Sequence, residues 1–177
     1  MRIFARALTI TGLAVAAAGA ALFLAATYGQ ETARVEWEEQ AVRPGESSSI
    51  TRLSFPEQHK EFFVEDGASK RALLRGPARI TWSVEPGQSG NCIIAAHRDT
   101  HFRMLMNVQA DEHVVLERKG QRFLYRITAL QVVRATDQSF YQPTKGAVLT
   151  LVTCYPFYYV GNAPKRFIVR AVLESVS

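Results

Sequence analysis

The sequence predicts a mainly β domain, a sandwich or a barrel, that follows one long apolar helix near the N-terminus. The segments after residue 50 are short, rich in β-branched and aromatic residues, and separated by turn signals. Strands spaced in this way favour a sandwich or a barrel over a doubly wound sheet. A run of 22 uncharged residues close to the N-terminus predicts the helix.

The composition fits one globular domain with an appendage, because the 177 residues are 47% hydrophobic and 21% charged. The net charge of +5 is modest, and the basic residues form neither a block nor a stripe interleaved with aromatic residues. We therefore expect no nucleic-acid partner. The two cysteines lack the clustered Cys and His spacing of a zinc site, so we expect no metal and no other cofactor.

The uncharged run, Ala7–Tyr28, is long enough for a helix that spans a hydrocarbon core of about 30 Å. Arg2 and Arg6 precede it, so the positive-inside rule keeps residues 1–6 in the cytoplasm and places the following chain outside. A cleaved signal peptide is the alternative, since Leu24-Ala25-Ala26 offers small residues for a cut. We expect a retained single-pass anchor, because the run exceeds the roughly 7–15 residues of a signal core.

A polar segment, residues 29–49, is expected to join the span to a folded domain of residues 50–177. Thr32–Gln40 contains good helix formers and is expected to continue as a short juxtamembrane helix. Arg43–Ser49 has the composition of a linker.

Within the folded domain, six segments have strand composition and turn signals at their ends. They are Arg79–Val84, Asn91–Ala96, Val114–Arg118, Arg122–Ala129, Val148–Thr153 and Arg166–Leu173. Lys119-Gly120-Gln121 predicts a hairpin turn, and Leu130–Val133 either extends the strand before it or begins another. Helical turns are expected around Ser69–Leu74 and over Thr100–Val108.

One predicted strand runs directly into Cys154, and Pro156 stops that strand from continuing as a central one. A cysteine in this position is either a buried structural thiol or a nucleophile that faces a cleft. Because only a few per cent of a free thiol is ionised at pH 7, a nucleophile needs a neighbouring imidazole or guanidinium. The oxyanion formed on attack needs a donor such as arginine. A disulfide with Cys92 is a further alternative in an exported domain.

His97 and Arg166 meet these needs, because each lies where a predicted strand meets a polar loop. His97 follows the apolar run Cys92–Ala96, and alternation places it on the face opposite Cys92. Arg166 opens the last strand. If the strands of Cys154 and Arg166 are antiparallel neighbours, the two side chains lie close together.

Three motifs resemble those of the sortases, the cysteine transpeptidases of bacterial cell surfaces. Thr150-Leu151-Val152-Thr153-Cys154 resembles their Thr-Leu-x-Thr-Cys motif, and Ala96-His97-Arg98-Asp99-Thr100 resembles their histidine segment. Lys165-Arg166-Phe167-Ile168-Val169-Arg170-Ala171 resembles their C-terminal arginine strand. The motifs stand in the family's order, and the similarity covers about residues 50–175.

The run Cys154-Tyr155-Pro156-Phe157 resembles the class D group of this family in particular. Two positions depart from the family pattern. Ala96 stands before the histidine where the family often has glycine, and Ala110-Asp111 stands in place of a common Gly-Asp pair. Alanine tolerates fewer backbone conformations than glycine, so the local geometry is expected to differ if either position needs a positive φ.

The resemblance implies a closed sortase-type β-barrel of about eight strands with short helices. It implies that Cys154 is the nucleophile, that His97 is the general acid and base, and that Arg166 stabilises the oxyanion or holds the substrate backbone. Thr153 is a weaker candidate for an oxyanion or orienting contact. The residues after the nucleophile either pack over the barrel rim or form a wall for an apolar substrate residue: Tyr155, Pro156 and Phe157, with Tyr158 and Tyr159.

The implied reaction cleaves a Leu-Pro-x-Thr-like sorting signal after its threonine, through a thioester on Cys154. The acyl group then passes to an amine acceptor, a peptidoglycan precursor or a protein lysine, which makes the enzyme a peptidase and acyltransferase of the hydrolase class. The implied partners are surface proteins that carry a C-terminal sorting signal, and the lipid bilayer. The expected location is the bacterial cytoplasmic membrane, with the catalytic domain on the extracytoplasmic side.

Two alternatives remain at this point. One is a catalytically silent, anchored β-barrel that binds surface proteins. The other is a cysteine hydrolase that releases them.

Overall fold

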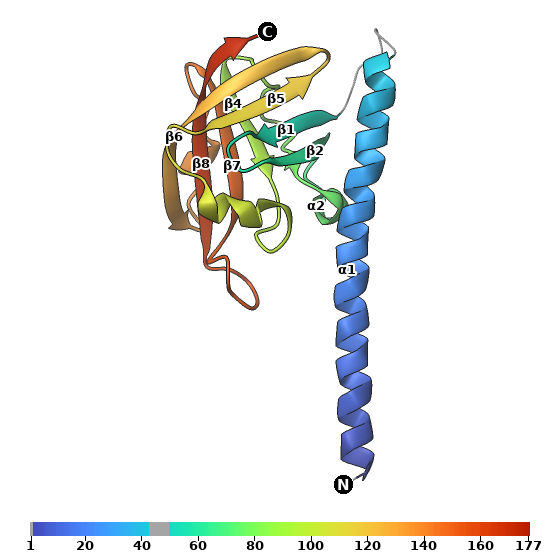
Figure 1. The fold of residues 1–177 in the computed structure, drawn as a ribbon. Helices are drawn as coiled ribbons and strands as arrows, with labels where there is room; N and C mark the ends of the chain where they lie inside the picture. The colour runs from blue at the N-terminus through green and yellow to red at the C-terminus, as the bar shows by residue number, and fades with distance from the viewer. Residues whose placement is uncertain (1, 43–49) are drawn as a thin grey trace.

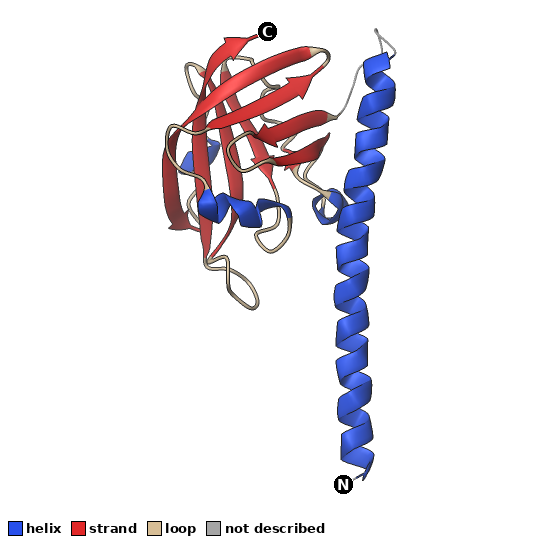
Figure 2. Ribbon diagram, in the orientation of Figure 1, coloured by secondary structure: helices blue, strands red, loops and turns tan. Residues whose placement is uncertain are grey.

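The computed structural model describes residues 2–42 and 50–177, which form one long helix beside a closed barrel (Figures 1 and 2). The helix, α1 (Arg2–Val42), is continuous over 41 residues. It includes the predicted juxtamembrane segment Thr32–Gln40, whose glutamate and alanine residues favour helix. By length and composition, its stretch Arg6–Glu39 is able to cross a membrane. The predicted linker Arg43–Ser49 lies outside the described residues.

The barrel contains eight strands, as the resemblance implies. They are β1 (Thr51–Phe55), β2 (Lys60–Asp66), β3 (Ala78–Arg79), β4 (Gly90–Ala95), β5 (His113–Arg118), β6 (Gln121–Arg134), β7 (Ala147–Tyr155) and β8 (Lys165–Val176). Their order around the barrel is β1-β2-β3-β4-β7-β8-β6-β5, and β5 pairs with β1 to close it. The pairs β2–β3 and β4–β7 are parallel, and the other pairs are antiparallel.

Alternate residues of the strands divide between the barrel interior and an outer apolar cluster. The interior is filled by large side chains that include Leu53, Phe55, Ile94, Leu116, Tyr125, Leu149 and Leu151. On the outside, Ile93 of β4, Val152 of β7 and Ile168 of β8 pack together against Phe140. Phe140 belongs to the short helix η2 (Ser139–Tyr141), so the β6–β7 connection partly covers this outer face.

Several local predictions are confirmed. Lys119 and Gly120 have φ values of 52° and 74° and join β5 to β6 as a tight hairpin turn. Leu130–Val133 extends β6 rather than starting a new strand. Helical turns form at α2 (Lys70–Arg75), where Ser69 caps the helix by accepting the N–H of Ala72, and at the 3-10 helix η1 (His101–Asn107).

The predicted strand Arg79–Val84 is wrong beyond its first residue. After β3 the chain turns, because both the N–H and the hydroxyl of Ser83 bond to the carbonyl of Ile80. The Arg79 guanidinium donates to the carbonyl of Ser83 and holds this turn from the strand side. Serine side chains compete with ladder bonds in this way. Strands β1 and β2 are not among the predicted strands.

Candidate active site

His97, Cys154 and Arg166 lie at the same end of three neighbouring strands. Cys154 and Arg166 are direct partners in the antiparallel pair β7–β8, where facing Cα atoms lie roughly 4.5–5.5 Å apart. Strand β4 runs parallel to β7, with Ala95 beside Val152. Two residues further along the two strands are His97 and Cys154, so the register places His97, Cys154 and Arg166 at neighbouring positions.

The three side chains share the outer face of the barrel. Val152 and Ile168 belong to the outer apolar cluster. Cys154 and Arg166 lie two residues from them, on the same side of their strands. His97 is exposed in the loop that follows β4. A buried apolar cluster therefore lies beside the polar trio and supports the strands that carry it.

Thr153 ties the end of β7 to the end of β4. Its Oγ1 donates to the carbonyl of Ala96 at 2.7 Å, and the N–H of Ala96 donates to the carbonyl of Val152 at 3.2 Å. Thr153 is buried. Its hydroxyl proton is engaged by the residue immediately before His97, so the geometry favours an orienting role over direct contact with an oxyanion.

The environments of the two cysteines differ sharply. Cys154 is partly exposed, whereas Cys92 is 1% exposed inside the barrel. Burial raises the pKa of the Cys92 thiol to about 12, so Cys92 stays protonated and unreactive at neutral pH. Only Cys154 of the two has the access that a nucleophile needs.

The disulfide alternative is wrong, because both cysteines are free. Cys92 is paired with Leu149, which lies five residues before Cys154 on β7. This separation corresponds to roughly 16 Å along a strand. A disulfide requires Cα atoms within about 7 Å of each other.

Arg166 is held at the base of the loop that connects β7 to β8, residues 156–164. Its Nη1 donates to the carbonyl of Ala163 at 3.2 Å and to that of Lys165 at 2.9 Å. These bonds keep the guanidinium beside the cysteine strand.

The β7–β8 loop is fastened to the histidine loop by Arg98, a contact that the sequence alone does not indicate. Arg98 donates to the carbonyls of Tyr159 at 2.6 Å and Gly161 at 3.1 Å, and its guanidinium lies 5.7 Å from the centre of the Tyr159 ring. These bonds take the place of the local ion pair that the neighbouring Asp99 suggests. The only sequence signal for this contact is that Arg98 follows His97 directly.

The aromatic residues after the nucleophile fall into two groups. Tyr155 and Phe157 pack against each other and against Phe167, with ring centres 5.3–6.2 Å apart, and so cover the barrel rim. Tyr158 and Tyr159 are exposed at the loop. Pro156, between Tyr155 and Phe157, follows a cis peptide bond and is partly buried.

The two alanines that depart from the family pattern fit without strain. Neither Ala96 nor Ala110 has a positive φ, and the positive φ of 69° in this region belongs to Asp111. The backbone therefore needs no glycine at either alanine.

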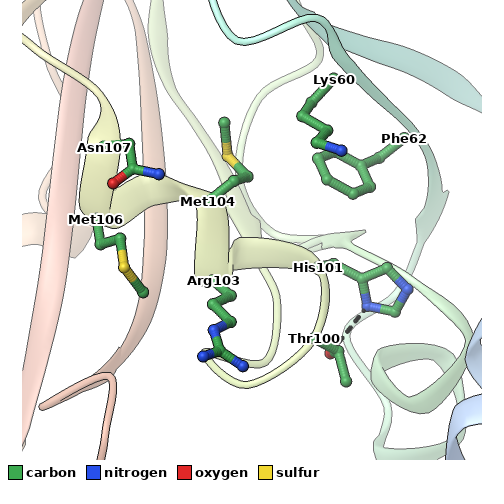
Figure 3. A pocket seen from close by; sticks show the side chains of 8 residues that line it. All are labelled: Lys60, Phe62, Thr100, His101, Arg103, Met104, Met106 and Asn107. Carbon is green, nitrogen blue, oxygen red and sulfur yellow. Dashed lines mark hydrogen bonds between the residues drawn. The ribbon is translucent and has the colours of Figure 1, made fainter.

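A separate hollow of about 370 Å³ lies between β2 and η1 and does not include the trio (Figure 3). Lys60 and Phe62 line it from the strand side, and His101 and Met104 are among the η1 residues that line it. His101, at the start of η1, is buried with its ring edge-on to Phe62. Burial, and then the charge of His97, lower the pKa of His101. Across residues 2–42 and 50–177, no group of three or more His, Cys, Asp or Glu side chains is placed to hold a metal ion.

Known proteins share this fold. The sortase domain family model matches residues 53–174. Sortase D of Bacillus subtilis is 32% identical over 126 residues, which cover 71% of this chain and 63% of that protein. Sortase A from Corynebacterium diphtheriae superimposes with a TM-score of 0.67 at 25% identity, covering 73% of this chain and 62% of that one.

The catalytic domain of SrtD from B. anthracis superimposes with a TM-score of 0.62 at 30% identity, covering 76% of this chain and 91% of that domain. The chain spans less than two thirds of the length of the Bacillus subtilis and Corynebacterium relatives. The family model covers well over half of the chain, and the closed barrel agrees with it. The chain therefore belongs to the sortase family, and its resemblance to class D agrees with relatives named Sortase D and SrtD.

Proposed function

We propose that this protein is a membrane-anchored cysteine transpeptidase that cleaves a Leu-Pro-x-Thr-like sorting signal after its threonine. The observation that carries the proposal is the register of β4, β7 and β8, which supports a site formed by His97, Cys154 and Arg166 at neighbouring strand ends. Family membership supports the same chemistry. The substrates are surface proteins with a C-terminal sorting signal, and the acceptor is an amine.

In the first half-reaction His97 takes the proton of the Cys154 thiol, and the sulfur attacks the threonine carbonyl to form an S–C bond. Arg166 stabilises the oxyanion of this tetrahedral intermediate, and the peptide C–N bond then breaks as His97 gives its proton to the departing amine. In the second half-reaction an acceptor amine attacks the thioester and loses a proton to His97. The S–C bond then breaks, and His97 returns that proton to the sulfur, which regenerates the thiol of Cys154.

The chain divides in this proposal into a cytoplasmic N-terminus (1–6), a span (7–28), a juxtamembrane segment (29–49) and an extracytoplasmic catalytic domain (50–177). The apolar run ends two residues before Gln30, which bonds to β2, and this supports the division.

The test is mass spectrometry of the full-length protein in detergent after incubation with Leu-Pro-x-Thr-containing peptides. We expect an acyl adduct on Cys154 that disappears when an amine acceptor is added, with release of the joined product. Cys92→Ala should retain the adduct, and Cys154→Ala should lose it. An adduct that persists in Cys154→Ala would exclude this nucleophile, and release to water at the same rate with and without the amine would favour the hydrolase.

A further inference from the structure

The side chain of Gln30 joins the helix α1 to the barrel through hydrogen bonds. The Gln30 side chain pairs with the backbone of Phe63 in β2 in both directions: its Nε2 donates to the Phe63 carbonyl at 3.0 Å, and its Oε1 accepts the Phe63 N–H at 2.8 Å. Nε2 also donates to the carbonyl of Arg75 at the end of α2, at 3.3 Å. One side chain thus bonds α1 to two elements of the barrel.

Close packing reinforces this joint on both sides of Gln30. A Cβ on Gly29 would lie 2.5 Å from the Cβ of Arg75, so the helix approaches α2 as closely as glycine allows. One turn further on, Ala33 is buried against Ile50 and Phe63. Trp37 packs on Phe63, with ring centres 6.0 Å apart. A helix held by bonds and packing over several turns fixes the direction of the barrel relative to its axis.

The joint lies at the end of the apolar run of α1, whose Ala26 is already buried. The uncharged residues 7–28 are followed at once by Gly29 and Gln30. At 1.5 Å per residue this run is roughly 33 Å long, close to the thickness of a hydrocarbon core. If α1 spans the bilayer, α2 therefore lies at the level of the lipid headgroups.

The exposed face of α2 carries side chains that suit contact with lipid headgroups. Lys70 and Arg71 are exposed, and Leu74, on the same side of the helix, is 44% exposed. Cations beside an isolated apolar side chain suit a surface of anionic headgroups over acyl chains.

The end of the barrel that carries Cys154 faces the same direction as the N-terminal half of α1. In Figure 1 the loop between β7 and β8 hangs from the barrel toward the N-terminal half of α1, and the C-terminus lies at the opposite end. This loop carries three exposed apolar or aromatic side chains in a row: Tyr158 at 74%, Tyr159 at 46% and Val160 at 100%. Tyrosines beside an aliphatic residue are typical of chains that sit at the boundary between headgroups and acyl chains.

We propose that the barrel end that carries Cys154 rests on the outer surface of the bilayer. The tip Tyr158–Val160 enters the interfacial layer, and Lys70 and Arg71 contact anionic phospholipid headgroups. The proposal rests on the membrane span proposed above, but not on the catalytic roles. Its consequence is that the site meets a sorting signal at the surface of the membrane.

The test uses the full-length chain in nanodiscs of phosphatidylcholine with about a third phosphatidylglycerol. Val160→Cys is made in a Cys154→Ala background and labelled with an environment-sensitive fluorophore, because Cys92 is too buried to react. Ser177→Cys, at the opposite end of the barrel, is the matched control. Nitroxide lipids should quench the label at 160 several-fold more than the label at 177. Equal, weak quenching at both positions would overturn the proposal.

The contribution of α2 is tested separately with Lys70→Glu/Arg71→Glu. Because each basic residue near an anionic surface changes binding roughly fivefold, this variant should lower the docked-to-undocked ratio by at least roughly tenfold, as measured by quenching at 160. Lys119→Glu/Arg122→Glu is the control, since Arg122 pairs with the C-terminal Ser177 far from the membrane. An equal effect of both double variants would contradict the role of α2.

Co-flotation with vesicles reports the span independently of orientation. A chain that fails to float overturns both the anchor and the docking. A chain that floats and forms the Cys154 adduct, but shows no quenching at 160, overturns the docking alone.

Discussion

At the scale of single residues, the strand position decides what each cysteine and threonine does. The barrel interior takes Cys92 and suppresses its ionisation, while the outer face leaves Cys154 accessible. On β7, Thr150 and Thr153 both use their hydroxyls inside the protein, one on the side chain of Asn91 and one on the carbonyl of Ala96. The type of residue alone therefore does not predict which cysteine is accessible or which threonine bonds to the residue before His97.

Alkylation tests the difference between the cysteines. Iodoacetamide at pH 8 should modify Cys154 and leave Cys92 unmodified in the folded protein, because the Cys92 thiol has a pKa of about 12 and is buried. Peptide mapping by mass spectrometry gives the occupancy of each site. After denaturation both should react, which serves as the control. Preferential modification of Cys92 in the folded chain would contradict the assignment.

Thr153→Val tests whether the hydroxyl orients the histidine loop. Valine keeps the shape but leaves the Ala96 carbonyl without this donor, so we expect a loss of about 1–2 kcal/mol in the free energy of unfolding. We also expect kcat/KM to fall roughly tenfold or more, since small misplacements of catalytic groups are costly. Thr150→Val removes a buried hydrogen bond from the same strand, further from the site. It should cost similar stability and leave kcat/KM unchanged, so equal kinetic losses would exclude an orienting role.

At the scale of elements, the barrel is fastened by charged contacts between segments distant in sequence. Asp66 at the end of β2 accepts bonds from Arg79 of β3 at 2.7 Å and from Arg118 of β5 at 2.8 Å. Arg118 also donates to Thr51 of β1. Burial acts to raise the pKa of Asp66, but the two guanidinium groups outweigh it and hold that pKa below its usual value.

Asp66→Asn should therefore destabilise the barrel in a pH-dependent way. With its folded pKa lowered, Asp66 contributes stability that is present above the unfolded pKa of about 3.9 and is lost as the pH falls through the lower folded pKa. At pH 7 we expect a loss of about 3 kcal/mol, because two buried arginines lose a charged partner. Urea unfolding at pH 7, 5 and 3 should show the gap to wild type narrowing toward pH 3. Asp111→Asn, at an exposed ion pair, is the control and should show no such gap.

A second contact between elements links the β7–β8 loop to the loop after β4. Arg98→Met removes the donors to Tyr159 and Gly161, so we expect faster amide exchange at residues 158–161 and a KM for the sorting peptide raised roughly threefold to tenfold. Thermal stability should stay unchanged, because the contact is at the surface. Arg103→Met, which removes a 5.1 Å ring contact and a weak 3.4 Å bond to Tyr158, should have a smaller effect. If amide exchange at residues 158–161 is the same in both variants, Arg98 does not hold this loop in place.

The elements that sequence predicts well are those with a strong local pattern. The strands that end near Cys154 and begin at Arg166 are dense in β-branched residues, and the three site motifs have short, fixed spacings. Strands β1 and β2 are short and contain few apolar residues, so no strong local pattern marks them, although they pair with each other as a hairpin. The Arg98 bonds depend on a loop about sixty residues later in the chain, which no local pattern indicates.

At the scale of the whole molecule, the contact between α1 and β2 fixes the orientation of the barrel relative to the helix. The sequence predicts both a span and a domain, but the direction of one relative to the other depends on a side chain of α1 bonding to the backbone of β2. No periodicity encodes such a contact. The joint gives the barrel a fixed height and tilt above the proposed membrane, which a flexible linker would not provide.

Gly29→Leu tests the joint directly. Its Cβ would lie 2.5 Å from the Cβ and 2.8 Å from the Cα of Arg75, and a backbone atom cannot move aside cheaply, so α1 must separate from α2. The Phe63 N–H then loses Gln30 as its acceptor, and we expect its exchange with deuterium in nanodiscs to accelerate at least roughly tenfold. Gly19→Leu is the matched control, because nothing lies within 4 Å of a Cβ at that position.

The same pair of variants separates orientation from catalysis. A released barrel keeps its trio, so Gly29→Leu should process a soluble sorting peptide at the rate of wild type. It should process a substrate held in the same nanodisc several-fold more slowly, because the site no longer faces the membrane plane. Unchanged Phe63 protection in Gly29→Leu would mean that α1 and the barrel are not joined at this point. Faster Phe63 exchange with both substrates processed at the wild-type rate would mean that the joint exists but does not direct the site.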